Sequence, residues 1–135
     1  MIFSLDIVQG SKMRKYSICI NFDKDLDNLT SQLNKIFQVK GQLRQDEFIK
    51  AYDWQLFGYS ITLVEDPDLT DDNGIPFSEF NYAIFINLSS AENLELNDKF
   101  VDIFGKLLIC KISQKVSKKC LLVDHLQEVI NWNDL

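Results

Sequence analysis

The sequence predicts a single α+β domain, residues 1–135, in which two main helices cover one face of an antiparallel or mixed sheet of about five strands. Three observations predict this fold. Several segments alternate apolar and smaller polar residues, as strands with one buried face do. Two longer segments carry apolar residues at helical spacing. The order of these segments contains the ferredoxin-like βαββαβ order, which places both helices on one side of the sheet.

The first predicted strands lie near residues 3–8 and 15–22 and are expected to pair as a hairpin across a turn at Gln9–Lys12. A helix is predicted near 25–38, because acids at its start suit a helix N-terminus and leucines recur on one stripe. Gly41 is expected to stop this helix.

Residues 42–53 allow two interpretations, a short helix after Asp46-Glu47 or an irregular lead-in to the next strand. Strands are then predicted near 56–64 and 80–88, separated by a polar loop from Glu65 to Gly74.

The second helix is predicted near residues 97–116. Additional apolar residues widen its stripe, so we expect it to be buried on more than one side. Its main stripe consists of Phe100, Ile103, Phe104, Leu107 and Ile112. A last strand is predicted near 120–123, followed by a terminal turn of helix at 126–130 with Trp132 packed behind it.

The net charge and the residue composition argue against several classes of function. The net charge of −6 argues against general nucleic-acid binding and against docking on an anionic membrane, since both need basic surface. We find no apolar run long enough to span a bilayer and no basic, apolar start typical of a secretory signal. The three cysteines are expected to be reduced and mostly buried in a cytoplasmic protein. With a single histidine and no CxxC pair, a Cys/His zinc site is excluded.

The most conspicuous segment runs from Glu65 to Asp72 and holds five acids within eight residues. It does not fit a calcium loop, because Asp71 stands where glycine is needed and Phe77 where the last glutamate belongs. Two interpretations remain, a solvated turn and an electrostatic docking loop for a basic partner. From Glu65 to Asp102 the net charge is −9, whereas from Lys106 to Val123 it is +5. Such asymmetry can steer association. The alternative interpretation is that the lysines are simply the solvent face and C-terminal end of the last long helix.

No constellation predicts catalysis. Asp124-His125 could form an acid-oriented base, but consecutive residues usually point apart, so we interpret the pair as a strand-to-helix turn. The strand near 80–88 lacks the basic and aromatic pattern with which RNA recognition motifs stack bases. Phosphate-cradle, zinc-protease and nucleophile-elbow motifs are also missing from the sequence. We therefore expect a protein that is not an enzyme, with no catalytic residue, metal or cofactor.

In overall character the chain resembles bacterial immunity proteins, the cytosolic antitoxins of contact-dependent and other polymorphic toxin systems. The features behind the resemblance are the acidic loop Glu65–Asp72, the aromatic strand Phe80–Leu88 and the helix-strand end Phe100–Val123. The resemblance implies tight binding to a cognate toxin domain, such as a basic nuclease.

The predicted function is therefore an inhibitor that binds a toxin domain by protein–protein contact. The alternatives are a small-molecule-binding or regulatory α+β domain with a pocket between sheet and helices, and an enzyme of another family. In the first hypothesis the acids meet cationic residues of the toxin, and aromatic residues beside the loop supply buried anchors. The residues expected at the partner surface are Glu65, Asp66, Asp68, Asp71, Asp72, Phe77, Glu79 and Phe80.

Overall fold

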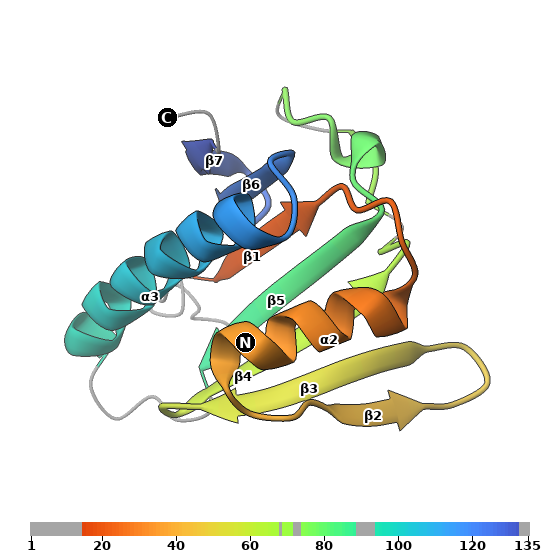
Figure 1. Cartoon of the computed structure of the whole chain (residues 1–135). Coiled ribbons are helices and arrows are strands. Elements are labelled where there is room, and N and C mark those ends of the chain that lie inside the picture. Colours follow the sequence, from red (N-terminus) through yellow and green to blue (C-terminus); the bar gives the residue numbers. More distant parts are fainter. Residues whose placement is uncertain (1–14, 68, 72–73, 89–93, 133–135) are drawn as a thin grey trace, which may run out of the picture.

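The described part of the chain forms one seven-stranded antiparallel sheet with two helices on one face (Figure 1). The computed structural model describes residues 15–67, 69–71, 74–88 and 94–132. The strands run in the order β2-β3-β4-β5-β1-β6-β7. The elements are β1 (Tyr16–Ile20), α2 (Leu26–Phe37), β2 (Gln42–Gln45), β3 (Lys50–Leu56), β4 (Tyr59–Glu65), the 3-10 turn η1 (Phe77–Glu79), β5 (Tyr82–Leu88), α3 (Leu94–Lys115), β6 (Cys120–Asp124) and β7 (Glu128–Trp132).

The predicted α+β character is confirmed, but the predicted sheet of about five strands in ferredoxin-like order is wrong. Strands β2 and β3 extend the sheet beyond β4, and β7 extends it beyond β6. The predicted strands near 15–22, 80–88 and 120–123 correspond to β1, β5 and β6. The strand expected near residues 3–8 lies outside the described residues.

The hairpin β2–β3 includes residues 42–53, for which the sequence allowed a short helix or an irregular lead-in to the next strand. Asp46 suggested a helix start, but its Oδ1 accepts hydrogen bonds from the backbone N–H groups of Phe48 and Ile49, both 2.8 Å, inside the hairpin turn. An Asp side chain makes the same local contacts at a helix N-terminus and in a turn, so these contacts do not distinguish the two. Downstream, Tyr52 and Trp54 then alternate with polar residues as a strand requires.

Two other boundaries differ from expectation for reasons of turn geometry. Phe57 and Gly58 both have positive φ, 53° and 82°, and form the tight turn between β3 and β4, so the strand expected from residue 56 begins at Tyr59. His125 and Leu126 also have positive φ, so the chain reverses there into β7 instead of the expected helical turn. In β7, Ile130 is an extra residue, because Leu122 pairs with Asn131 and Val123 with Val129.

Helix α2 begins where predicted, and its N-cap Asp25 accepts a hydrogen bond of 2.9 Å from the backbone N–H of Asn28. Its leucine stripe, Leu26, Leu29 and Leu33, is buried in the main core under the sheet. The helix ends in a left-handed residue at Gln38, three residues before the expected stop at Gly41.

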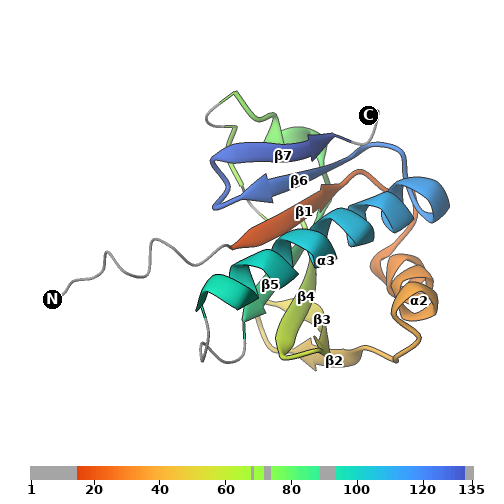
Figure 2. The ribbon, with the colours of Figure 1, turned by 90° about the vertical axis from the view of Figure 1, so that its left-hand side faces the viewer.

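Helix α3 packs on the same face of the sheet (Figure 2). Its buried residues are Val101, Leu108, Ile109 and Ile112. The expectation of a helix buried on more than one side is wrong, because Phe100, Ile103 and Leu107 lie on the solvent side. Gly105 faces the sheet so closely that an added Cβ would lie 2.9 Å from the Tyr16 ring.

Gly41 has a packing role beside Trp54. An added Cβ would lie 2.7 Å from the indole ring, and the Gly41 N–H donates to Asn34 Oδ1 at 2.8 Å. Trp54 Nε1 donates to the same oxygen at 2.9 Å, so this corner joins α2 to β3. Its tight packing leaves no room for a methyl group.

We predict that Gly41→Ala lowers the free energy of unfolding by about 1–3 kcal/mol, because overpacking displaces the indole or the backbone. Urea denaturation measures this loss. In a double-mutant cycle, the same substitution should cost clearly less in a Trp54→Phe background, whose smaller ring relieves the clash. Equal costs in both backgrounds would contradict the packing explanation.

The cysteines are free, as predicted, but only two are buried: Cys19 and Cys120 are inside and Cys110 is exposed. Burial raises the pKa of both the Cys19 and the Cys120 thiols to about 12.

We predict that a disulfide-exchange reagent at pH 8 modifies Cys110 in the native protein and all three thiols only in denaturant. Mass spectrometry of the labelled peptides identifies the site, and rapid native labelling of Cys19 would contradict the fold.

Candidate protein-binding surface

The chain between β4 and β5 carries most of the predicted site and packs on the sheet face opposite the helices. It is held by a second hydrophobic core, separate from the core beneath the helices. Both Phe77 and Phe80, expected to anchor a partner, are buried in this second core. Their rings therefore stabilise the protein's own fold. The buried members of the core are Cys19, Ile75, Phe77, Phe80, Leu121 and Val123.

Four of the predicted acidic residues lie on the surface of this segment: Glu65, Asp66, Asp71 and Glu79 are all exposed. The backbone N–H of Asp66 donates to the carbonyl oxygen of Asn81 at 2.8 Å, which brings the two ends of the segment together. Asp68 and Asp72 lie outside the described residues. We define the acidic surface as the four described residues Glu65, Asp66, Asp71 and Glu79.

Local contacts hold individual acids of this surface. Asp71 Oδ1 accepts a hydrogen bond of 2.8 Å from the backbone N–H of Ser78, and Glu79 forms a 2.9 Å ion pair with Lys119. The Tyr82 hydroxyl donates to the carbonyl of Lys24 at 2.7 Å and lies 3.5 Å from Glu65. Burial, with the nearby Glu65 carboxylate, raises the pKa of Tyr82 to about 12. These contacts restrict the side chains of Asp71, Glu79 and Glu65.

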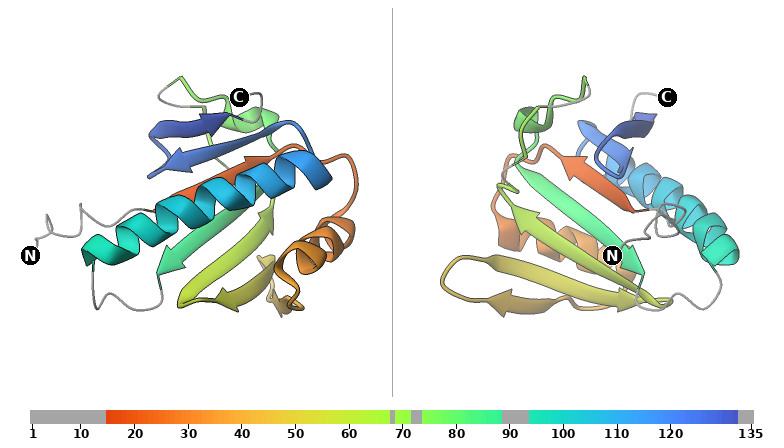
Figure 3. Two further views of the ribbon diagram at one scale, coloured as in Figure 1. Left: turned by 60° about the vertical axis from the view of Figure 1, so that its left-hand side comes forward. Right: turned by 180° about the vertical axis from the view of Figure 1, so that it is seen from behind.

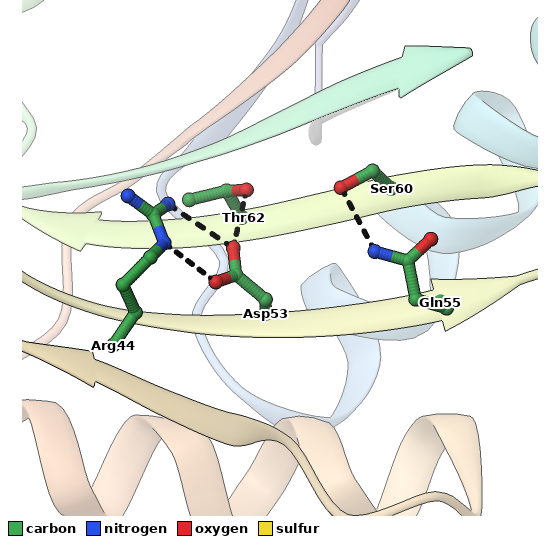
Figure 4. A network of polar contacts seen from close by, with 5 residues as sticks. All are labelled: Arg44, Asp53, Gln55, Ser60 and Thr62. Atoms are coloured by element: carbon green, nitrogen blue, oxygen red, sulfur yellow. Dashed lines mark hydrogen bonds and ion pairs between the residues drawn. The ribbon is translucent and has the colours of Figure 1, made fainter. Parts of the chain in front are cut away.

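The same sheet face carries a polar network that sequence analysis missed (Figure 4). Asp53 of β3 accepts hydrogen bonds from Arg44 Nε at 2.8 Å, from Arg44 Nη2 at 3.2 Å and from Thr62 Oγ1 at 2.7 Å. Two residues on, Gln55 Nε2 donates to Ser60 Oγ at 3.2 Å. The only available signal was strand alternation in residues 50–56, which would have placed Asp53 and Gln55 on one face.

This network joins three neighbouring strands and has the geometry of a structural clamp. The Arg44 hydrogen bonds, followed by that of Thr62, hold the pKa of Asp53 below its usual value despite partial burial. Asp53 raises the pKa of Arg44 in turn. A carboxylate held in its charged form by a bidentate guanidinium is a poor proton carrier near neutral pH, so we assign it a stabilising role.

The Asp124-His125 pair lies in the β6–β7 turn. His125 Nε2 is 3.4 Å from Asp124 Oδ1, and the N–H of Gln127 donates to the carbonyl of Asp124 at 3.0 Å. Beside it is a hollow of about 240 Å³, lined by Ser17, Asn87 and His125 among others. The pair is therefore part of a turn, as expected, but the turn connects two strands.

The predicted alternative of a pocket between sheet and helices is not favoured by the packing, because that space holds the main hydrophobic core. Within the described residues, no group of three or more His, Cys, Asp or Glu side chains is arranged to hold a metal ion. None of the helices in the described ranges combines the length and apolarity needed to cross a membrane.

Comparison with protein-family models, curated proteins and solved structures found no match to the chain.

We predict that Asp53→Asn lowers the free energy of unfolding by about 1 kcal/mol at pH 7, because the ionised, bidentate acceptor is lost. The folded-state pKa of Asp53 lies below its unfolded value, so the contribution is complete above the unfolded pKa near 4 and is lost as pH falls through the folded value. Urea titrations of both proteins from pH 7 to pH 2 measure the difference.

Glu47, an exposed acid in the β2–β3 turn, provides the control. Glu47→Gln should change the free energy of unfolding at pH 7 by less than about 0.5 kcal/mol. If the Asp53→Asn difference persists unchanged at pH 2, its origin is not the charged clamp.

Proposed function

We propose that this protein is an immunity-type inhibitor that binds a cognate toxin domain with a basic surface, such as a nuclease, and neutralises it by contact. The observation that carries the proposal is the acidic surface, whose carboxylates project from a backbone segment anchored by its own hydrophobic core. Carboxylates that local contacts already restrict lose less conformational entropy on binding than carboxylates that are free to move.

Electrostatics support this choice of partner. Exposed carboxylates on one side of a chain with a net charge of −6 attract a cationic protein over long range and accelerate encounter. The active site of a nuclease contains cationic residues that hold the phosphates of its substrate. Carboxylates of an inhibitor can bind these cationic residues in place of the phosphates. Specificity then comes from the register of individual charge pairs, which a fixed backbone maintains.

A co-expression experiment tests the role. Immunity genes accompany the toxin genes they protect against, so the reading frame immediately upstream in the native genome is the first candidate partner. Its product should arrest growth when expressed alone and should not do so when co-expressed with this protein. The purified pair should form a stoichiometric complex, and a complex that leaves toxicity intact would contradict the proposal.

We predict that the triple variant Glu65→Gln, Asp66→Asn and Asp71→Asn associates with the toxin about tenfold more slowly at low salt. Asn at position 66 accommodates the left-handed backbone, φ 47°, and Asn at position 71 retains the oxygen that accepts the Ser78 hydrogen bond. The melting temperature should therefore change little. Stopped-flow association rates at several ionic strengths measure the effect, which should shrink as salt screens the charges.

A charge-matched control separates local from global electrostatics. Ser31, Gln42 and Gln45 are exposed on α2 and β2, and replacing them with lysine changes the net charge by the same amount as the triple variant. The control should associate within about twofold of the parent protein. Equal slowing in both variants would show that net charge, and not the acidic surface, governs the encounter.

A further inference from the structure

Helix α3 presents an apolar stripe on its solvent side. Phe100, Ile103 and Leu107 are 53%, 54% and 62% exposed, although their neighbours Val101, Leu108 and Ile112 are buried against the sheet. The exposed Cys110 and Gln114 continue the same line toward the end of the helix. We call the line Phe100, Ile103, Leu107, Cys110 and Gln114 the α3 seam. In Figure 3, left, α3 is the cyan-to-blue helix that crosses in front of the sheet, and none of the coloured ribbon passes in front of it.

The seam has the spacing of a helix–helix contact. Its residues are separated by three, four, three and four positions, which is the heptad spacing that keeps one edge of a helix against a partner helix. The stripe is also narrow, one row of side chains wide, whereas a helix that lies in a membrane surface usually presents a broad apolar face. The geometry therefore favours a helical protein segment over a lipid surface.

Lysines border the seam on both sides. Lys99 and Lys106, about two helical turns apart, follow one edge, and Lys111 and Lys115, about one turn apart, follow the other. Lys106 Nζ forms an ion pair with Asp102 Oδ2 at 3.1 Å, which neutralises part of the positive charge along the first edge. On the second edge, Lys111, Lys115 and Lys35 of α2 line a hollow of about 480 Å³ together with Gln32, Ile36 and Gln38.

The residues that line the hollow carry an excess of positive charge. Among the residues that the structure describes, Lys35, Lys111 and Lys115 form no ion pair. None of the described residues that line this hollow is acidic. Three ammonium groups around one depression repel each other, and bound carboxylates would relieve that repulsion.

We propose that the α3 seam docks an amphipathic helix of a partner protein, with apolar residues at heptad spacing and acidic residues along its flanks. The apolar residues would cover Phe100, Ile103 and Leu107, and the flanking carboxylates would meet the lysines, chiefly at the hollow beside α2. A second copy of this chain fits less well, because two seams in contact would oppose lysines to lysines. The inference is independent of the toxin-binding proposal, which uses the other face of the sheet.

The test uses the full chain and a designed peptide probe. The probe is a fluorescent three-heptad peptide with leucine at the two seam positions and glutamate at the two flanking positions of each heptad. Its counterpart carries lysine at the flanking positions. Both peptides repel copies of themselves, so neither self-associates strongly. We expect the glutamate peptide to bind at least tenfold more tightly than the lysine peptide in fluorescence anisotropy.

Variants of the protein locate the site. Ile103→Glu with Leu107→Glu should weaken binding of the glutamate peptide at least tenfold, and Lys111→Gln with Lys115→Gln should weaken it several-fold in low salt. All four side chains are exposed, so the melting temperatures should stay close to that of the parent. Phe48→Ser, which removes a large exposed apolar side chain from the β2–β3 turn, is the control for nonspecific apolar adhesion and should bind as the parent does.

Several results would overturn the proposal. Equal affinity for both peptides, or equal weakening by Phe48→Ser and by the seam variant, would show nonspecific apolar adhesion. Cosedimentation with phosphatidylglycerol vesicles that depends on Leu107, without peptide binding, would assign the seam to a lipid surface. A dimer in sedimentation velocity that Leu107→Glu dissociates would assign it to a second copy of the chain.

Discussion

Strand β1 is buried on both faces, and the other elements depend on it. Every residue from Tyr16 to Ile20 is inaccessible to solvent, and each pairs with β5 on one side and β6 on the other. Ile18 and Ile20 enter the core beneath the helices, whereas Cys19 enters the core beneath the acidic segment. One five-residue strand thus connects the two hydrophobic cores, because successive side chains of a strand point to opposite faces.

The same strand contributes to the orientation of α3 on the sheet. The Tyr16 hydroxyl donates to Asp102 Oδ1 at 2.6 Å, and the Tyr16 ring packs where Gly105 has no side chain. These two contacts suit the rotation of α3 that buries Val101, Leu108 and Ile112 and leaves Phe100, Ile103 and Leu107 outward. The outward stripe forgoes about 25 cal/mol of burial free energy for each Å² that remains in water.

Secondary structure was predicted correctly from the sequence where the period of the apolar residues and the length of the segment indicated the same type of element. Helix α2 and strands β1, β5 and β6 follow their expected bounds closely. Helix α2, β1 and β5 each show one apolar face of the right period in the sequence, and β6 is a short apolar run. Residues 42–55 were not predicted as strands, because Asp46 resembles a helix N-cap. Residues 128–132 were not predicted as a strand, because the tight turn at His125-Leu126 contains no glycine that would indicate it. These errors removed three strands and gave the wrong sheet.

The candidate surfaces show a similar division. The density of acids between Glu65 and Glu79 was visible in the sequence, and the described members are exposed. The burial of Phe77 and Phe80 was not predictable, because only tertiary structure shows that the connection folds back on β1 and β6. For α3, periodicity showed apolar residues around much of the helix but could not decide which of them would face the sheet.

The two sheet edges have a consequence for solubility. An open seven-stranded sheet has two rows of backbone groups to which another chain could add a strand. Here β2 is only four residues long and carries exposed side chains, including the charged Arg44, and β7 is kinked by the extra residue Ile130. Either edge offers an incoming strand a short or irregular row of hydrogen bonds, which disfavours fibril growth. The sheet can thus remain open, without closing into a barrel, and still resist polymerisation.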